Sequence, residues 1–166
     1  MTMVIEGGTF TQNVYGAGTT IASNGDRTGD ITIIIEGGTF GTDCSIIAGG
    51  KNAVFGDVNL IISGGDFSDS SAIYAGVDDS NKAITGNTTV TLSGIENGND
   101  FASYTGILSG SGTEAAGKTG TGSGKGVWGT GTLVLEGYTA DSLGMTLQDF
   151  DTISLTSKSN TVYLMG

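Results

Sequence analysis

The chain of 166 residues contains no histidine, no proline and one cysteine, Cys44. The lack of histidine excludes Ser-His-Asp and Cys-His catalysis, and it excludes metal sites with histidine ligands. A lone cysteine excludes an internal disulfide and a cysteine-rich zinc cluster. We therefore expect no metal site and no cofactor, and we interpret the chain as a protein that is not an enzyme.

Charged residues are scarce, and most carry one sign. Lysine and arginine number 6 and aspartate and glutamate 17, which gives a formal net charge of −11. Nucleic acids and anionic membranes bind clustered basic residues, so we expect neither as a partner.

Long apolar runs are missing as well. No stretch approaches the roughly 18 apolar residues of a membrane helix, so we expect no membrane-spanning segment in this chain. The N-terminus lacks the charged region and following apolar run of a signal peptide. We therefore expect any export signal to lie upstream of residue 1.

Glycine is abundant, at 31 of 166 residues. Each glycine inside a helix costs about 1 kcal/mol relative to alanine, so this composition disfavours long helices. Collagen is excluded because glycine does not recur at every third position and proline is absent. Recurring runs of Val, Ile and Leu argue against disorder.

An internal repeat organises the chain. Four segments align without gaps: GDITIIIEG (29–37), GDVNLIISG (56–64), GNTTVTLSG (86–94) and GTGTLVLEG (129–137). In each, two apolar residues stand two positions apart, which is the period of a strand with one buried face. We expect one vertical column of Ile33, Leu60, Val90 and Leu133, and a second of Ile35, Ile62, Leu92 and Leu135. Met3 and Ile5 align with these inward positions, as do Ile153 and Leu155 of a further coil.

A second strand follows each of the first ones. It reads VYGAG from Val14, IIAGG from Ile46, IYAGV from Ile73 and ILSGS from Ile107. A phenylalanine recurs between the two strands, and we expect a third column made of Phe10, Phe40, Phe67 and Phe101.

The spacing of the repeats indicates the architecture. Their closing glycines lie 27 or 30 residues apart up to Gly94, and Gly137 follows after 43 residues. Strands so spaced, with no helix between them, bury their cores only by stacking on the next coil. We predict an all-β fold: a single-stranded, right-handed parallel β-helix (β-solenoid) of about 27–30 residues per coil. It would form one domain over residues 1–166 with five to six coils, and we expect it to be part of a longer array or to stack end to end.

The 43-residue interval contains a Gly/Ser/Thr-rich loop insertion at 109–131. It holds three residues that we regard as a candidate contact loop: Lys118, Lys125 and Trp128. The segment GTEAAGKT (112–119) matches a phosphate-binding loop, but glycines rather than a helix follow its lysine, so we reject nucleotide binding.

Short polar residues follow the turn glycines. We expect Asp30, Asp57 and Asn87 to bond their own backbone, as such residues do in turns. Other acidic residues occur in close pairs, and we interpret them as solvated turn carboxylates, although calcium binding stays open: Asp26/Asp30, Asp66/Asp69 and Asp78/Asp79. Carboxylates alone can hydrolyse glycans, but no acidic pair stands out here, and Arg27 is the one arginine.

The repeat wording resembles one group of proteins. IEGGTF (5–10) with VYGAG (14–18), and IIEGGTF (34–40) with IIAGG (46–50), resemble the repeats of secreted bacterial surface β-helix proteins. Autotransporter passengers and adhesin-like proteins are the nearest examples. The resemblance implies an extracellular or cell-surface location, a rigid stalk and a role in attachment or self-association. The membrane barrel that follows a typical passenger is not among these residues, so the secretion route stays open.

These observations lead to one main functional hypothesis and two alternatives. The main one is a non-catalytic structural or adhesive module, whose partner is a host or bacterial surface glycan or protein, or another copy of itself. The alternatives are a polysaccharide-binding or polysaccharide-cleaving β-helix, similar to tailspikes and pectin lyases, and a filament-forming subunit that stacks end to end.

Overall fold

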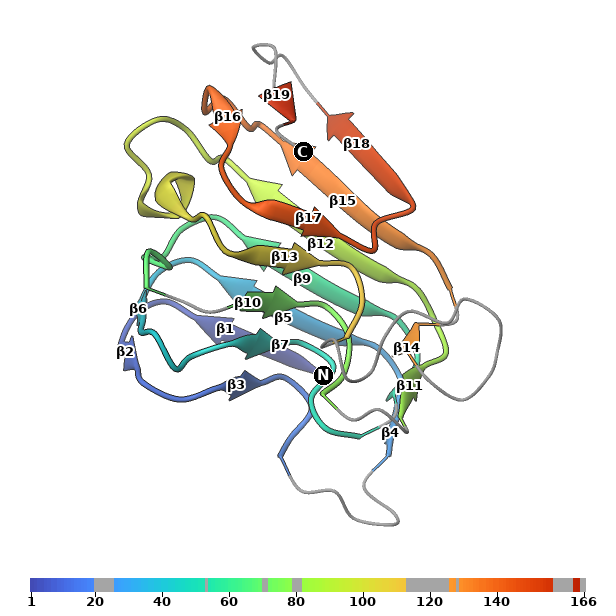
Figure 1. The fold of residues 1–166 in the computed structure, drawn as a ribbon. Helices are drawn as coiled ribbons and strands as arrows, with labels where there is room; N and C mark the ends of the chain where they lie inside the picture. The colour runs from blue at the N-terminus through green and yellow to red at the C-terminus, as the bar shows by residue number, and fades with distance from the viewer. Residues whose placement is uncertain are drawn as a thin grey trace.

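The computed structural model describes residues 1–19, 26–52, 54–69, 72–78, 82–112, 126–127, 129–156 and 163–164. Regular structure in these ranges is strand, apart from one short 3-10 turn, η1 (Asp100–Ser103). Every strand pairs in parallel with its neighbours (Figure 1). The prediction of an all-β chain is therefore confirmed, and its sheets are parallel. No helix in the described ranges is long and apolar enough to cross a membrane.

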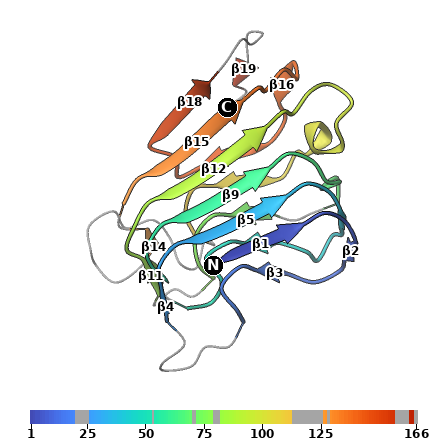
Figure 2. The same ribbon diagram turned by 180° about the vertical axis from the view of Figure 1, so that it is seen from behind.

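The largest sheet contains six strands, which lie side by side in chain order (Figure 2). They are β1 (Thr2–Ile5), β5 (Ile31–Ile35), β9 (Val58–Ile62), β12 (Thr88–Ser93), β15 (Gly131–Glu136) and β18 (Thr152–Thr156). Successive strands come from successive repeats, so the sequence repeat is the unit of this sheet.

The register of this sheet confirms the two aliphatic columns. Leu60 pairs with Ile33 on one side and with Val90 on the other. Leu133 continues the first column, and Met3 and Ile153 occupy its two ends. The second column is in register as well: Ile5, Ile35, Ile62, Leu92, Leu135 and Leu155. Because side chains alternate between the two faces of a strand, both columns point the same way.

Two smaller sheets complete the repeats. The five-stranded sheet contains β3 (Val14–Tyr15), β7 (Ile46–Ile47), β10 (Ala72–Tyr74), β13 (Ile107–Ser109) and β17 (Thr146–Gln148). The four-stranded sheet contains β4 (Arg27–Thr28), β8 (Val54–Phe55), β11 (Ala83–Ile84) and β14 (Gly126–Val127). Two-stranded pairs join β2 (Thr9–Phe10) to β6 (Thr39–Phe40), and β16 (Ser142–Leu143) to β19 (Tyr163–Leu164). The chain visits the six-, five- and four-stranded sheets in the same order in successive repeats.

The five-stranded sheet corrects one detail of the predicted alignment. Its fourth strand pairs Leu108, and not Ile107, with Ile73. A shift of one residue exchanges the two faces of a strand. The shift buries the Leu108 side chain completely, while Ile107 stays half-exposed. Ile107 and Leu108 are both apolar, so the sequence pattern allowed either of them to pair with Ile73. Burial of Leu108 in the core determines which one does.

The core lies between the six-stranded and five-stranded sheets. Inward side chains of both sheets belong to one continuous apolar cluster, including Ile33, Leu60, Ile46 and Ile73. The sheets approach so closely that a Cβ added to Gly16, just after β3, would lie 2.3 Å from Cδ1 of Ile33. Stacked repeats thus share one dense interior, as protein cores do.

The phenylalanine column is confirmed for three residues and altered at the fourth. The rings of Phe10, Phe40 and Phe67 stack nearly parallel, with centroids 4.9 and 4.2 Å apart. Phe101 instead meets Phe67 edge-on, at 5.3 Å and 86°. A four-residue insertion precedes Phe101 and places it on η1, whereas Phe10 and Phe40 lie in short parallel strands and Phe67 follows the bridge residue Asp66.

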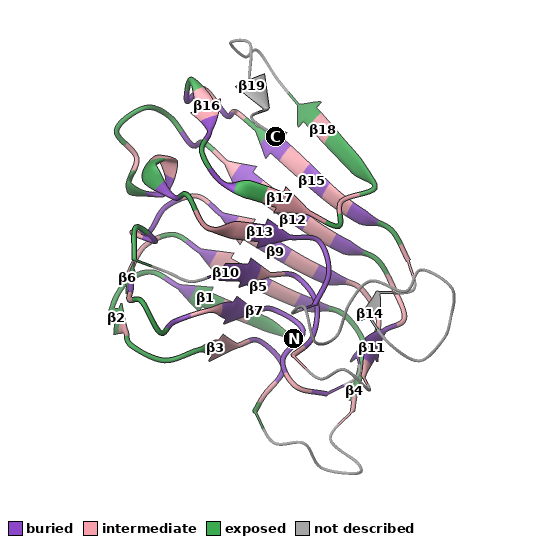
Figure 3. Cartoon of the chain, in the orientation of Figure 1, coloured by how far each residue is buried: buried purple, intermediate pink, exposed green. Residues whose placement is uncertain are grey.

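The last strand of the six-stranded sheet is exposed although its register is regular. Ile153 and Leu155 stand in the two aliphatic columns, yet their side chains are 39% and 60% exposed. Figure 3 shows the contrast between the banded burial of β15 and the exposed β18.

Candidate contact surfaces

The predicted contact residues Lys118, Lys125 and Trp128 lie outside the described residues. Some of the described residues of segment 109–131 belong to strands. Ser109 closes β13, and Gly126–Val127 forms β14, which pairs with Ala83 and Ile84 of β11. The segment therefore leaves the five-stranded sheet and returns to the four-stranded one.

A regular polar column runs along the outer face of the six-stranded sheet. Its members are paired strand to strand: Thr2, Thr32, Asn59, Thr89, Thr132 and Thr152. Neighbouring strands lie about 4.8 Å apart, so the column presents polar side chains at a constant interval. Threonine is stiff about χ1, which favours the same side-chain geometry on each strand.

A second outer column lies beside it, two residues further along each strand. It contains Val4, Ile34, Ile61, Thr91, Val134 and Ser154. Ile34, Ile61, Thr91 and Val134 are half-buried, and Val4 is 50% exposed. Neither column contains a charged residue. These two columns therefore combine hydroxyl, amide and branched apolar side chains without charge, whereas Glu136, two residues beyond Val134 on the same face of β15, is charged.

A ladder of side-chain hydrogen bonds runs along the turn before these strands. The backbone N–H of Asp57 donates to Asp30 Oδ1 at 3.0 Å, and that of Asn87 donates to Asp57 Oδ1 at 2.7 Å. Thr130 continues the ladder, since its backbone N–H donates to Asn87 Oδ1 at 3.0 Å. The prediction that these residues bond their own backbone was wrong, because each side-chain oxygen accepts from a backbone N–H of the next repeat. They join one repeat to the next, and this role accounts for the three side chains without a ligand.

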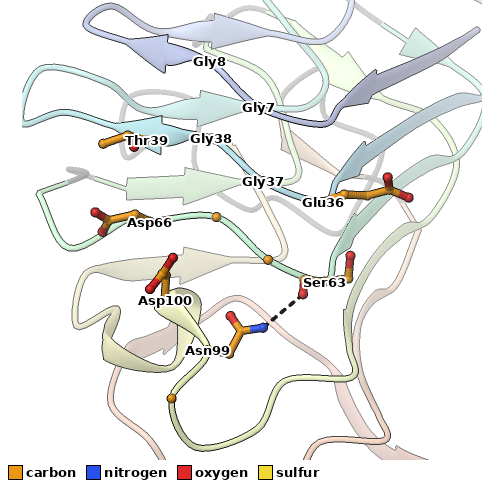
Figure 4. A pocket seen from close by; sticks show the side chains of 13 residues that line it. Gly7, Gly8, Glu36, Gly37, Gly38, Thr39, Ser63, Asp66, Asn99 and Asp100 are labelled. Carbon is orange, nitrogen blue, oxygen red and sulfur yellow. Dashed lines mark hydrogen bonds between the residues drawn. The ribbon is translucent and has the colours of Figure 1, made fainter.

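A polar groove of about 610 Å³ follows the turns after β1, β5 and β9. Paired glycines line it: Gly7–Gly8 and Gly37–Gly38, which Figure 4 labels, and Gly64–Gly65 of the following repeat. A Cβ on Gly64 would lie 2.5 Å from the carbonyl oxygen of Glu36, and Gly65 has a φ of +105°. Close stacking of turns thus explains these glycines without a ligand.

The polar side chains of this groove are engaged locally. Asp66 accepts hydrogen bonds from the hydroxyl and the backbone N–H of Ser68, which lower the pKa of its carboxyl group. Asn99 accepts from the N–H of Phe101 and donates to the carbonyl oxygen of Ser63 at 3.2 Å (Figure 4). Glu36 lies apart from Asp66 and Asp100 in the same view. The described residues contain no group of three acidic, Cys or His side chains that could hold a metal ion.

Two of the acidic pairs flagged in the sequence contribute to ion pairs. Lys82 Nζ lies 2.8 Å from Asp26 Oδ1, and Lys51 Nζ lies 3.8 Å from Asp78 Oδ2. Asp79 lies outside the described residues. Partly exposed pairs of this kind contribute at most about 1 kcal/mol, so their value is to orient the loops.

A second hollow of about 390 Å³ lies beside Tyr15, at the end of β3. The Tyr15 hydroxyl donates to Asp78 Oδ2 at 3.0 Å, and Lys51 Nζ lies 5.1 Å from the centre of its ring. The sequence analysis did not single out this place. The sequence did contain one signal. Tyr15 stands at the position where the next repeat has Ile47, so a tyrosine replaces an aliphatic residue there.

Comparisons with known proteins add no assignment. The chain matches no family model, no curated protein and no solved structure. Its function must therefore be inferred from the surfaces described above.

Proposed function

We propose that this chain is a non-catalytic structural and adhesive module of a bacterial cell-surface or secreted protein. Its fold would be a right-handed parallel β-helix of five to six coils. The recurring order of the three sheets supports closed coils, and parallel strands joined by crossovers are right-handed in about 98% of cases. The extracellular location rests on the resemblance of the repeats to secreted surface proteins.

The outer face of the six-stranded sheet is the observation that carries the proposal. Six strands repeat the same pair of uncharged columns in register, from Thr2 and Val4 to Thr152 and Ser154. Such a face offers many equivalent weak contacts. Linked contacts gain avidity by about 10²–10⁴-fold without any stronger single contact. The partner would be a host or bacterial surface glycan or protein, or a second copy of the chain.

Bead adhesion tests this proposal. Beads coated with the chain are measured for attachment to bacterial and epithelial cells and to one another under flow. The variant Ile61→Asp/Thr89→Asp places charge in the middle of both outer columns, and we expect at least a tenfold loss of attachment. Ser63→Asp/Ser93→Asp is the matched control, because it adds the same two charges at the ends of the same two strands and outside both columns. Circular dichroism verifies that each variant remains folded.

Two outcomes contradict the proposal. One is that beads with the unchanged chain attach neither to cells nor to each other. The other is that the Ile61→Asp/Thr89→Asp beads attach as well as the control beads.

End-to-end assembly is a second candidate, favoured by the exposed last strand. Ile153 and Leu155 continue the buried columns but remain exposed, and β18 is the last strand of the six-stranded sheet in the part of the chain that the structure describes. Open edges with apolar side chains promote pairing between chains. Sedimentation at rising concentration would reveal oligomers that Leu155→Lys abolishes. A single monomeric species at all concentrations would exclude this candidate.

A further inference from the structure

We propose that the hollow beside Tyr15 is a binding site for one neutral sugar unit of a glycan. The inference rests on the proposed adhesive function and names a ligand class for it. Six residues line the hollow: Gln12, Asn13, Tyr15, Thr19, Asp43 and Lys51. Its volume of about 390 Å³ lies within the range of about 300–1,000 Å³ that is usual for small-molecule pockets.

One wall of the hollow is held in place by a chain of hydrogen bonds. The backbone N–H of Ser45 donates to Asn13 Oδ1 at 2.8 Å, and Asn13 Nδ2 donates to the Tyr15 hydroxyl at 3.2 Å. That hydroxyl in turn donates to Asp78, which also attracts Lys51. Residues from three repeats therefore fix the position of the tyrosine. A wall that is ordered before binding lowers the entropic cost of taking up a ligand.

Three further polar side chains line the hollow. Gln12, Thr19 and Asp43 are exposed, and their side chains make no hydrogen bond with any residue that the structure describes. The amide and the hydroxyl both donate and accept, whereas the carboxylate accepts. A sugar ring carries several hydroxyl groups that donate and accept in the same way. The tyrosine ring adds apolar carbon surface to this set, and Lys51 Nζ lies 5.1 Å from the ring centre.

Charge selects a neutral sugar over an acidic one. Lys51 is the one cation of the lining, and Asp78 lies 3.8 Å from it. Asp43 adds a negative charge that forms no ion pair with the residues that the structure describes, and the whole chain carries −11. A uronic acid or a sialylated unit would meet net repulsion here.

The glycine groove makes a useful contrast. It is the larger hollow, yet its lining includes no aromatic side chain. Its Asp66 and Asn99 are already bonded to neighbouring residues. Substitutions in that groove therefore serve as controls for the tyrosine hollow.

The experiment titrates the whole chain with soluble sugars and follows binding by NMR. The probes are methyl glycosides of neutral hexoses, short N-acetylhexosamine oligomers and short uronic-acid oligomers. We expect saturable binding of a neutral probe with a Kd on the order of 1 mM, typical of one subsite with few hydrogen bonds. The uronic-acid oligomers should bind at least tenfold more weakly.

Two variants test the residues. Gln12→Ala and Asp43→Ala each remove one group that faces the ligand, and each should raise the Kd by about fivefold to tenfold. Asp66→Asn and Asp100→Asn in the glycine groove should leave the Kd within twofold. The inference is overturned if no neutral probe binds saturably, if the uronic acids bind best, or if both tyrosine-hollow variants bind like the unchanged chain.

The bead assay separates this inference from the proposed function. If beads attach to cells while no neutral sugar binds, the sugar site is wrong and the adhesive function stands. If a neutral sugar binds at the hollow while the beads attach to nothing, the site stands and the adhesive function is wrong.

Discussion

The middle and the last strand of the six-stranded sheet share a register but not an environment. Leu60 in β9 and Leu155 in β18 both occupy inward columns, yet Leu60 is completely buried and Leu155 is 60% exposed. A regular register is therefore not sufficient to bury the apolar side chains of a strand in this fold. Burial comes from the repeats stacked on either side, as in other repeat proteins. Stability should therefore depend on where in the stack a substitution falls.

The largest expected effect comes from truncating the two leucines. Leu60→Ala should lower the free energy of unfolding by about 2–5 kcal/mol, because it opens a cavity in the core between the two neighbouring strands. Leu155→Ala should change it by no more than about 0.5 kcal/mol, as an exposed substitution does. Urea unfolding followed by circular dichroism measures both. Equal losses for the two variants would contradict the comparison.

A second pair contrasts a stacked turn with an open one. Gly64→Ala places a Cβ 2.5 Å from the carbonyl oxygen of Glu36, so we expect a loss of about 1–3 kcal/mol. Gly7 stands at the equivalent place of the first repeat, where an added Cβ meets nothing within 4 Å. Gly7→Ala should therefore be neutral within about 0.5 kcal/mol. If the same unfolding assay ranks Gly7→Ala as the more damaging variant, the turns do not stack as described.

The polar ladder should contribute less than the apolar columns. Asp57→Ala removes the acceptor of the Asn87 N–H and should cost about 1 kcal/mol. Asp57→Asn should recover most of this loss, because an amide oxygen already fills the same role at Asn87. Asp141 is the control, since its exposed carboxylate makes no hydrogen bond with the residues that the structure describes. A loss of stability for Asp141→Ala as large as that for Asp57→Ala would remove the ladder from the explanation.

At neutral pH the smallest effect is expected from titration, because the chain has no histidine. Burial raises the pKa of the Tyr104 hydroxyl and raises that of Tyr138 to about 12. The unfolded chain loses these protons near pH 10, so their contribution to stability is complete below about pH 10. It is lost as the pH rises from about 10 towards 12.

Unfolding at pH 7, 9, 10 and 11 measures this loss. Tyr104→Phe and Tyr138→Phe should flatten the alkaline decline, because each removes a hydroxyl whose pKa is raised by burial. A decline that begins below pH 9, or one that the two buried-site variants leave unchanged, would contradict the assignment.

Short-range periodicity was enough to predict the strands of the six-stranded sheet and their two columns, but not the four-stranded sheet, whose strands of two residues are too short to show a period. The alternation around Ile33 and Leu60 appears in four segments of the same length, so one alignment placed both columns and the three stacked phenylalanines correctly. The predictions that were wrong concern contacts between one repeat and the next. Neither the register shift of Leu108 nor the hydrogen bond from the Asn87 N–H to Asp57 could be inferred from the sequence. In both cases the alternatives use the same residue types and differ only in the residue of the neighbouring repeat that is contacted.

The candidate site was the least predictable part. The hollow beside Tyr15 joins side chains from residues 12 to 51, with Asp78 behind them, and no local motif marks that combination. Conversely, the loop that composition favoured as a contact site has its three named residues outside the described ranges.

Spin-label distances test most directly whether the equivalent strands of successive repeats lie in register, one above another. Labels at Thr2→Cys and Thr132→Cys sit four strands apart in one outer column. Cys44 is completely buried, and burial raises the pKa of its thiol, so it stays unlabelled. Parallel stacking predicts a separation near 19 Å, and moving the second label to Thr152→Cys should add about 5 Å. A separation above about 35 Å for the first pair, or no increase for the second, would contradict the stacked-rung structure.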